Sequence, residues 1–329
     1  MPNLAKLLPD TAAANLATFS RRAKGAYAPN TERAIKADTE LFSFWCMAHG
    51  HASMPATVET VEAFIDNMAD HKAPATVRRY VSSIAKLHEA ARLSNPVTDP
   101  TSGRYRDPIQ LALRRMHRAK GRRQKQVTGM TFDIRARLLE KIDDSAKGLR
   151  DRALITVAYD TGLRRSELVA LDLADLHAGT DGLATLMIRK SKTDQEGEGT
   201  QALIAPDTLE HLQSWIEKAA ITQGAIFRSI KKGDRIQDDR LTDQSVRLIL
   251  KARATGSGLP LSIVEKISGH SPRVGLAQDM TASGLDLPAI MQAGRWKSPQ
   301  MVSRYTEHLQ ARKGGAAKLF ALQHRTSRT

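Results

Sequence analysis

The chain is divided by the stretch Arg118-Ala-Lys-Gly-Arg-Arg-Gln-Lys-Gln-Val-Thr-Gly129, which is polar, basic and bracketed by Gly121 and Gly129. Such a composition suits a solvated connection and gives a packed helix no apolar face. We therefore predict an interdomain linker over residues 120–130. A length of 329 residues agrees with two domains, at roughly 100–200 residues per domain.

Helical periodicity characterises the residues before this linker. Apolar side chains recur every three or four residues in four runs, the last of which starts at Asp107-Pro108. Residues 31–119 are therefore predicted to form a compact all-helical domain. Residues 1–30 are mixed and polar, and we expect them to be flexible.

The residues after the linker, 131–329, show a different pattern. Two short apolar runs, 184–190 and 201–205, flank a polar loop that contains glycine, which is typical of a β-hairpin. Most of the remaining residues favour helices. The fold class predicted for the whole chain is mainly α, with an all-helical first domain and a mixed, mostly helical second domain that carries a small β-hairpin or sheet.

Helix starts are marked near the end of the chain by prolines. A proline lies close to the first helical position after Ser271, Asp286 and Ser298. The last predicted helix, 316–322, is short and apolar and follows two glycines. These glycines allow it to leave its own domain and dock elsewhere.

Basic residues are in large excess. Lys and Arg number 50 and Asp and Glu 35, which gives a formal net charge of +15. Between residues 104 and 125 the only acid is Asp107, whereas basic residues are frequent. A folded and strongly basic chain suggests a polyanionic partner, and nucleic acid is the first choice. The alternative interpretation of this segment is a solvated helix face followed by a linker.

Several classes of protein are excluded by what the sequence lacks. No apolar run approaches the roughly 18 residues of a membrane span, and Cys46 is the only cysteine, which rules out an internal disulfide framework. Neither a phosphate-binding loop nor a dinucleotide fingerprint is present. Cys46, His49 and His51 lie close together, but we interpret them as a core cysteine and two surface histidines. No cofactor and no metal ion is predicted.

Two short strings carry the candidate chemistry. The first is Thr161-Gly-Leu-Arg-Arg-Ser-Glu-Leu168, and the second is Gly269-His-Ser-Pro-Arg273, which is followed by Gly294-Arg-Trp296 and by Tyr305. The Ser-Pro pair favours a helix start, which places His270 and Arg273 one turn apart at a helix N-terminus. Backbone N–H groups, an arginine and a histidine at such a position form an anion site. Taken alone, Arg273 is equally consistent with a surface salt bridge.

In combination, these strings resemble the tyrosine recombinase, or phage integrase, family. Gly-Leu-Arg-x-Ser-Glu-Leu, a hairpin lysine, His-x-x-Arg, Gly-x-Trp and a tyrosine nine residues after the tryptophan occur in the family's order. Trp296, in place of a second histidine, resembles the Cre-like members. The resemblance covers residues 131–322. It extends more loosely to the helical domain, for which it implies a core-binding role on DNA.

Catalytic residues follow from the resemblance by position. They are Arg164, Glu167, Lys192, His270, Arg273, Trp296 and Tyr305. Lys190 is an alternative hairpin amine, and Arg165 adjoins Arg164, so helix or strand phase decides which guanidinium faces the site. Tyr305, placed after a short helix, is favoured over Tyr80 and Tyr159, which occupy apolar helical positions.

The resemblance implies a site-specific DNA recombinase. Tyr305 would attack a DNA phosphodiester to give a 3′-phosphotyrosine and a free 5′-OH, followed by strand exchange through a Holliday junction. Arginine forks match phosphate oxygens, and a phenol with a reference pKa of about 10 needs a base such as His270. An ammonium such as that of Lys192 would protonate the leaving oxygen. Alternatives are a telomere resolvase, a type IB topoisomerase-like strand transferase, or a non-catalytic DNA-binding regulator.

The partners implied by the resemblance are double-stranded DNA with an inverted-repeat site and further copies of the chain. It implies a C-shaped clamp of two domains around DNA and a homotetramer on two sites, linked by exchange of helix 316–322. Accessory proteins are not specified by the sequence. No membrane is involved, and the implied location is cytoplasmic, on bacterial nucleoid or plasmid DNA or as a phage-encoded protein.

Basic helix faces supply candidate DNA contacts. The residues expected to contact the groove from the first domain are Arg33, Lys36, Lys72, Arg78 and Arg79. Those expected to clamp the backbone are Arg114, Arg115, Arg122 and Arg123. Gln244 is expected to read adenine and Arg247 guanine. For any one of them, a solvated helix face is the alternative.

Overall fold

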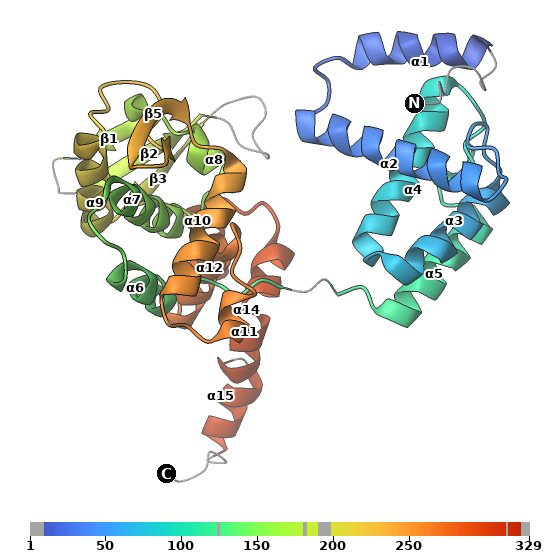
Figure 1. Ribbon diagram of the computed structural model, residues 1–329. Helices are drawn as coiled ribbons and strands as arrows, with labels where there is room; N and C mark the ends of the chain where they lie inside the picture. The colour runs from blue at the N-terminus through green and yellow to red at the C-terminus, as the bar shows by residue number, and fades with distance from the viewer. Residues whose placement is uncertain (1–9, 124–125, 180–182, 190–198, 314, 324–329) are drawn as a thin grey trace. The chain divides into compact units, whose positions relative to one another are not determined.

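The computed structural model describes residues 10–123, 126–179, 183–189, 199–313 and 315–323 (Figure 1). The chain divides into two compact units, residues 1–125 and 126–329. This boundary falls inside the linker predicted at 120–130. Helices predominate in both units, which confirms the mainly α fold class.

The first unit is built of helices. They are α1 (Asp10–Ala23), α2 (Pro29–Ala48), α3 (Val58–His71), α4 (Pro74–Ala91) and α5 (Asp107–Lys120). Proline occupies the first turn of α2, α4 and α5, where its fixed φ favours a helix and its missing N–H leaves no bond unmade. The apolar faces meet in one core, in which Phe42, Phe64 and Ile109 are fully buried.

Helix α1 lies within the segment 1–30, which was expected to be flexible, and for residues 10–23 that expectation is wrong. Ala12 is buried, and Asn15 Nδ2 donates a hydrogen bond of 3.1 Å to the carbonyl of Ala91 in α4. Seven of the fourteen residues of α1 are apolar, and five of these seven are alanines. The pattern is that of an amphipathic helix, although its apolar side chains are mostly small.

The second unit is arranged around helix α7 (Ala146–Thr161). Its other helices are α6 (Phe132–Glu140), α8 (Arg165–Ala170), α9 (Pro206–Lys218), α10 (Asp243–Gly256), α11 (Leu261–Val264), α12 (Ser271–Ala282), α13 (Leu287–Gly294), α14 (Pro299–Lys313) and α15 (Gly315–Leu322). The helix starts predicted at Ser271, Asp286 and Ser298 are confirmed. Asp286 caps α13, because its side chain accepts the N–H of Ala289 at 2.8 Å.

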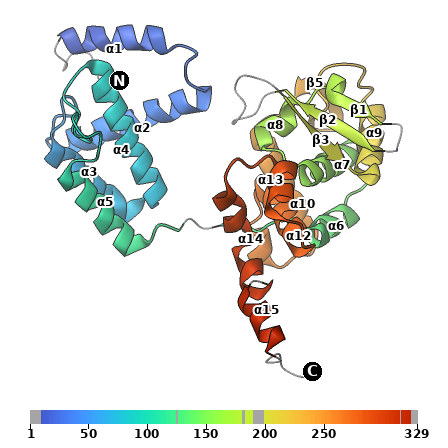
Figure 2. The ribbon, with the colours of Figure 1, turned by 180° about the vertical axis from the view of Figure 1, so that it is seen from behind.

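Strands form a minor part of this unit. A 3-10 turn, η2 (Leu173–Asp175), leads into an antiparallel sheet of β1 (Leu176–Ala178), β2 (Ala184–Ile188) and β3 (Thr200–Ile204), which lies beside α7 and α9 in Figure 2. The strands predicted at 184–190 and 201–205 correspond to β2 and β3; β2 ends at Ile188, and Lys190 lies outside the described residues. Strand β1 and a separate hairpin of β4 (Arg228–Lys231) and β5 (Arg235–Arg240) were not predicted.

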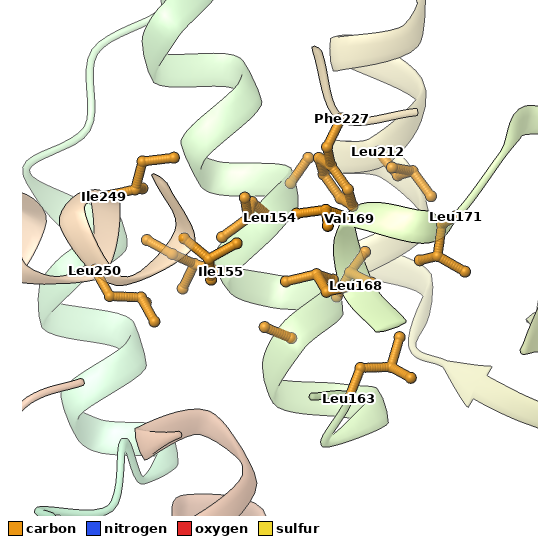
Figure 3. Packing of buried hydrophobic residues seen from close by; sticks show 14 of the residues in the cluster. Leu154, Ile155, Leu163, Leu168, Val169, Leu171, Leu212, Phe227, Ile249 and Leu250 are labelled. Atoms are coloured by element: carbon orange, nitrogen blue, oxygen red, sulfur yellow. The ribbon is translucent and has the colours of Figure 1, made fainter. Parts of the chain in front are cut away.

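The core of the second unit fixes α7 on several sides. Leu154 and Ile155 of α7 are fully buried, and Figure 3 shows them among side chains from α8, α9 and α10. Leu168 and Val169 of α8 lie in the same cluster, so the turn that joins α7 to α8 is held at both ends. This turn contains the first of the two motif strings.

The chain enters the second unit along α12 and α14. Met130 N donates to the carbonyl of Ser271 at 2.8 Å, and Gln126 Nε2 donates to the carbonyl of Arg304 in α14 at 3.0 Å. A Cβ added to Gly275 would lie only 1.9 Å from the Met130 carbonyl oxygen. The entering segment therefore packs directly on α12 and is fixed to both helices.

Candidate active site

The motif string 161–168 forms the turn between α7 and α8. Helix α7 ends at Thr161, and Gly162 caps it in the left-handed region at φ 56°, with its N–H on the carbonyl of Ala158. A side chain is disfavoured there by conformation and by space, since a Cβ would lie 2.9 Å from the side chain of Leu276. The sharp turn leaves the last carbonyls of α7 free to accept hydrogen bonds from elsewhere and places Arg164 at the N-cap of α8.

Glu167 holds Arg164 in place. Its Oε1 accepts from Arg164 Nη1 at 2.6 Å and its Oε2 from the Arg164 backbone N–H at 2.9 Å. The Glu167 side chain is only 4% exposed, whereas that of Arg164 is 27% exposed. The carboxylate thus orients the guanidinium, which remains partly accessible. Arg165 packs against Gly269, and its guanidinium lies 3.8 Å from Asp243.

The second motif string starts helix α12, as predicted. Ser271 Oγ accepts the N–H of Ser268 at 2.9 Å, and the proline that follows lies in the first turn. Arg273 is 2% exposed, and its Nη1 donates to the carbonyl of Gly162 at 2.6 Å. The surface salt bridge that was the alternative for Arg273 is therefore wrong. The two motif strings, which are far apart in the sequence, are joined by this bond.

Trp296 and Tyr305 complete the cluster. The guanidinium carbon of Arg273 lies 4.5 Å from the centre of the Trp296 ring, and the Tyr305 ring lies edge-on to that indole at 6.2 Å. Gly294 makes room for the indole, because a Cβ there would lie 1.8 Å from the ring. Tyr305 lies inside α14 and is 5% exposed. The prediction that it follows a short helix is wrong, since the helix continues to Lys313.

His270 contacts the phenol of Tyr305. Its Nε2 lies 2.8 Å from Tyr305 Oη. Burial and the guanidiniums of Arg273 and Arg164 lower the pKa of His270 to about 4, so the imidazole is neutral at pH 7 and can accept a proton. Burial raises the pKa of Tyr305, and the charges of Arg273 and Arg304 oppose that shift. Base and phenol are therefore paired within a positively charged surrounding.

Three buried donors in this cluster lack an acceptor within the described part of the chain. They are Nη2 of Arg273, Nη1 of Arg295 and Nε1 of Trp296. An unpaired buried donor costs about 1–3 kcal/mol, so several in one place indicate a site built for an external acceptor. Sequence reasoning missed Arg295. Its signal is its position between Gly294 and Trp296, in the motif itself.

The predicted hairpin amines, Lys192 and the alternative Lys190, lie outside the described residues. Cys46 is fully buried in the first core, and burial raises the pKa of its thiol to about 12. Among the residues that the structure describes, no group of three His, Cys, Asp or Glu side chains is placed to hold a metal ion. No described helix is long and apolar enough to cross a membrane.

The predicted DNA-contact residues are all exposed. They are Arg33, Lys36, Lys72, Arg78, Arg79, Arg114, Arg115, Arg122, Arg123, Gln244 and Arg247. Some guanidiniums already have acidic partners: Arg79 lies 3.0 Å from the buried Asp38, and Arg115 lies 2.9 Å from Glu62 and 2.6 Å from Asp66. Gln244 and Arg247 lie in the first turns of α10, where a recognition helix start was predicted.

A buried tyrosine paired with a neutral histidine beside several arginines, on this fold, defines the class of tyrosine-dependent DNA strand transferases. A family model described as the phage integrase family matches residues 129–312, more than half of the chain. The chain belongs to this family, and the predicted resemblance is confirmed.

Two curated relatives and one solved structure give the extent of the similarity. The integrase/recombinase XerD homolog of Selenomonas ruminantium is 34% identical over 297 residues, which cover 87% of this chain and 84% of the relative. The Cre recombinase of Escherichia phage P1 is 24% identical over 319 residues, 91% of this chain and 90% of the relative. A lambda integrase tetramer bound to a Holliday junction shares the fold, with a TM-score of 0.57 at 16% identity, over 91% of this chain and 81% of that one.

Proposed function

We propose that this protein is a site-specific recombinase that cleaves and rejoins DNA through a covalent bond to Tyr305. The observation that carries the proposal is the 2.8 Å contact between His270 Nε2 and Tyr305 Oη. It lies beside the buried Arg273, which keeps an N–H group without a partner in the described chain. A nucleophile, a base and an anion site are thus combined in one cluster.

The proposed cleavage step is a transesterification. Tyr305 Oη forms a bond to phosphorus while His270 Nε2 accepts the phenolic proton, and the bond from phosphorus to the 5′ oxygen breaks. The departing 5′ oxygen takes a proton from the hairpin lysine, Lys192 or the alternative Lys190. The products are a 3′-phosphotyrosine and a 5′-OH, and the reverse reaction with a different 5′-OH exchanges strands.

Charge supports this assignment. The pentacoordinate phosphorus formed by the attack carries about two negative charges, and preorganised guanidiniums stabilise such a state best where water is excluded. Arg273 is buried and Arg164 is held by Glu167, so neither needs to reorganise during the reaction. Their charges also favour the tyrosinate over the phenol, against the effect of burial.

The assembly is part of the same proposal. We infer that the two units clamp a duplex, that the target is an inverted repeat, and that four subunits join on two sites in bacterial nucleoid, plasmid or phage DNA. Helix α15 supports an exchange between subunits, because Leu319, Phe320 and Leu322 are 49%, 43% and 78% exposed. Apolar side chains presented in this way favour a contact with another molecule. A cyclic arrangement closes such head-to-tail contacts.

The test is capture of the covalent intermediate. The protein is incubated with fragmented bacterial DNA in EDTA, denatured, and the fragments attached to it are sequenced. Wild type and a Tyr159→Phe control are expected to retain DNA, since the Tyr159 hydroxyl is bound to Asp279 away from this cluster. Tyr305→Phe is expected to retain none.

The sequences of the captured fragments separate the alternatives. A shared inverted repeat supports recombination at a specific site, whereas scattered cleavage supports a topoisomerase-like activity and fragments with hairpin ends support a telomere resolvase. Sequence-specific binding without any adduct would favour the DNA-binding regulator, or a recombinase that depends on an accessory protein. Adducts that persist in Tyr305→Phe would refute the role of this tyrosine.

A further inference from the structure

Arg295 is the least expected residue of the site. It follows α13 and caps that helix in the left-handed region at φ 54°, a conformation that glycine adopts at lower cost. From there its side chain extends to the end of α7, where Nη2 donates to the carbonyl of Thr161 at 2.8 Å. The loop between α13 and α14 is thereby attached to the first motif string.

Arg273 makes a parallel contact from a different helix. Its Nη1 donates to the carbonyl of Gly162, the residue next to Thr161. Two guanidiniums thus bind two successive carbonyls at the C-terminal, partially negative end of α7. Each keeps one further nitrogen, Nη2 of Arg273 and Nη1 of Arg295, that is buried and without a partner among the described residues.

The charge of the cluster depends on Arg295. Arg164, Arg273 and Arg295 supply three positive charges, Glu167 supplies one negative charge, and His270 is neutral at pH 7. Arg165 and Arg304 add further positive charge near His270 and Tyr305. The surroundings of the phenol are therefore strongly positive, which suits a pentacoordinate phosphorus with about two negative charges, and Arg295 contributes one of the buried guanidiniums. The guanidiniums influence one another electrostatically. Burial is the main cause of the lowered pKa of Arg273, and the charges of Arg164 and Arg295 lower this pKa further.

We propose that Arg295 is a third phosphate-binding guanidinium, whose unpaired Nη1 donates to a non-bridging oxygen of the phosphate that Tyr305 attacks. Arg295 stays protonated throughout, and no bond to it forms or breaks. The hydrogen bond from Arg295 Nη2 to the Thr161 carbonyl fixes the guanidinium of Arg295, and the bond to the Gly162 carbonyl fixes that of Arg273 in the same way. The inference rests on the proposed function and adds a residue to it.

A purely structural role is the alternative. In that case Arg295 would only attach the loop between α13 and α14 to α7 through the Thr161 carbonyl. Replacing it would then slow cleavage equally for charged and uncharged substrates. The two roles therefore differ in how the loss responds to the charge on the phosphate.

The experiment compares two substrates in single-turnover cleavage. Both carry the sequence obtained by adduct capture, one with an ordinary phosphodiester and the other with an uncharged methylphosphonate at the cleaved position. Arg295→Gln is expected to slow cleavage of the phosphodiester about 100-fold, as for removal of one preorganised donor. On the methylphosphonate the loss is expected to be under about threefold, because less charge develops there.

Arg92→Gln is the matched control. Arg92 caps α4 in the same left-handed conformation, at φ 56°, but is exposed in the first unit. The Arg92→Gln variant is expected to cleave both substrates at the wild-type rate. Far-UV circular dichroism verifies that each variant is folded. If Arg295→Gln does not fold, Arg295→Lys takes its place, because lysine keeps the positive charge and lacks the guanidinium fork. The cleavage rate of the phosphodiester is then expected to fall about tenfold.

The outcomes separate this inference from the proposed function. Equal losses on both substrates in a folded variant, or no loss on either, would overturn the role of Arg295 and leave the recombinase proposal intact. Failure of wild type to cleave the phosphodiester would overturn both.

Discussion

His270 Nε2 and Tyr305 Oη lie 2.8 Å apart, although one residue caps the start of α12 and the other lies inside α14. The imidazole is therefore in direct contact with the phenol. Both side chains are held by packed helices, so the geometry needs no large adjustment for the proposed attack.

The first prediction concerns the titration of His270. Its pKa of about 4 predicts no protonation between pH 5.5 and 7.5, where an ordinary histidine near 6.5 titrates. In a heteronuclear NMR titration, the His270 signal, assigned through its loss in His270→Gln, should stay constant in that range. Bound phosphate should raise the pKa, because it offsets the guanidinium charges. An inflection near pH 6.5 in the free protein would contradict the burial of this ring.

The same shift has a consequence for stability. Because the folded protein binds the His270 proton more weakly than the unfolded chain does, the free energy of unfolding should fall as the pH decreases from about 6.5 to about 4. Above that range the contribution of His270 to stability is fully present, below it that contribution is fully lost, and in neither region does His270 add a further dependence on pH. Urea unfolding of wild type and His270→Gln across this range provides the comparison.

The second prediction concerns the close approach of Gly294 to Trp296. Gly294→Ala should lower the free energy of unfolding by about 1–3 kcal/mol, because the new Cβ would lie 1.8 Å from the indole. Gly256→Ala, at the end of α10, is the control, since nothing lies within 4 Å of a Cβ at that position. It should leave stability unchanged or raise it by up to about 1 kcal/mol, the gain in helix propensity. Trp296→Phe should relieve part of the clash, so a double-mutant cycle should show positive coupling. Additive effects would refute the contact.

The third prediction concerns the carboxylate of Glu167. Glu167→Gln should lower stability by about 1–3 kcal/mol, because two hydrogen bonds from Arg164 to a buried charged acceptor are weakened. Unfolding followed by tryptophan fluorescence in a Trp45→Phe background reports on the second unit alone, where the other two tryptophans lie. The exposed Glu265→Gln should change stability by less than about 0.5 kcal/mol. Equal effects of both changes would argue against the pairing.

The fourth prediction concerns which basic residues of the first unit contact DNA phosphates. Arg115, which the sequence led us to expect on the DNA backbone, is already paired with Glu62 and Asp66. Arg78, expected in the groove, is exposed and forms no ion pair with any residue that the structure describes, so we now expect Arg78 rather than Arg115 to contact a phosphate. Arg78→Ala should reduce the slope of log Kobs against log salt concentration by about 0.9, the value for one phosphate contact. Arg115→Ala should change that slope little. Binding to a random 40-base-pair duplex at several salt concentrations measures both, and a reversed order would refute the assignment.

The candidate site was largely predictable because its residues occur in short strings with fixed spacing. Arg164, Glu167, His270, Arg273, Trp296 and Tyr305 meet around the end of α7 in the structure. Local periodicity also predicts β2 and β3 and the start of α12. Such features depend on neighbouring residues and need no knowledge of packing.

The remaining features depend on contacts between distant residues. Arg295 was missed because its partner, Thr161, is remote in sequence and because an arginine at a helix end usually indicates solvent. The hairpin of β4 and β5 is too polar to show an apolar pattern; β5 reads Arg-Ile-Gln-Asp-Asp-Arg. Helix α1 has an apolar face made mainly of alanines, and its order depends on contacts with α4 that are remote in sequence. Sequence alone did not decide between Arg164 and Arg165, because the answer depends on where α8 begins. In the structure the Arg164 guanidinium is bound to Glu167, whereas the Arg165 side chain packs against Gly269.

The anchoring of the entering chain on α12 and α14 limits how far the two units can separate. Since Gln126 is bonded to α14 and α5 ends at Lys120, the intervening chain spans at most about 20 Å, at 3.3–3.6 Å per residue. Under the proposal that both units bind the same duplex, a tether this short raises the effective concentration of the second unit at that duplex to the millimolar range. Neither unit then needs high affinity of its own, and rejoined DNA can be released by one unit after the other.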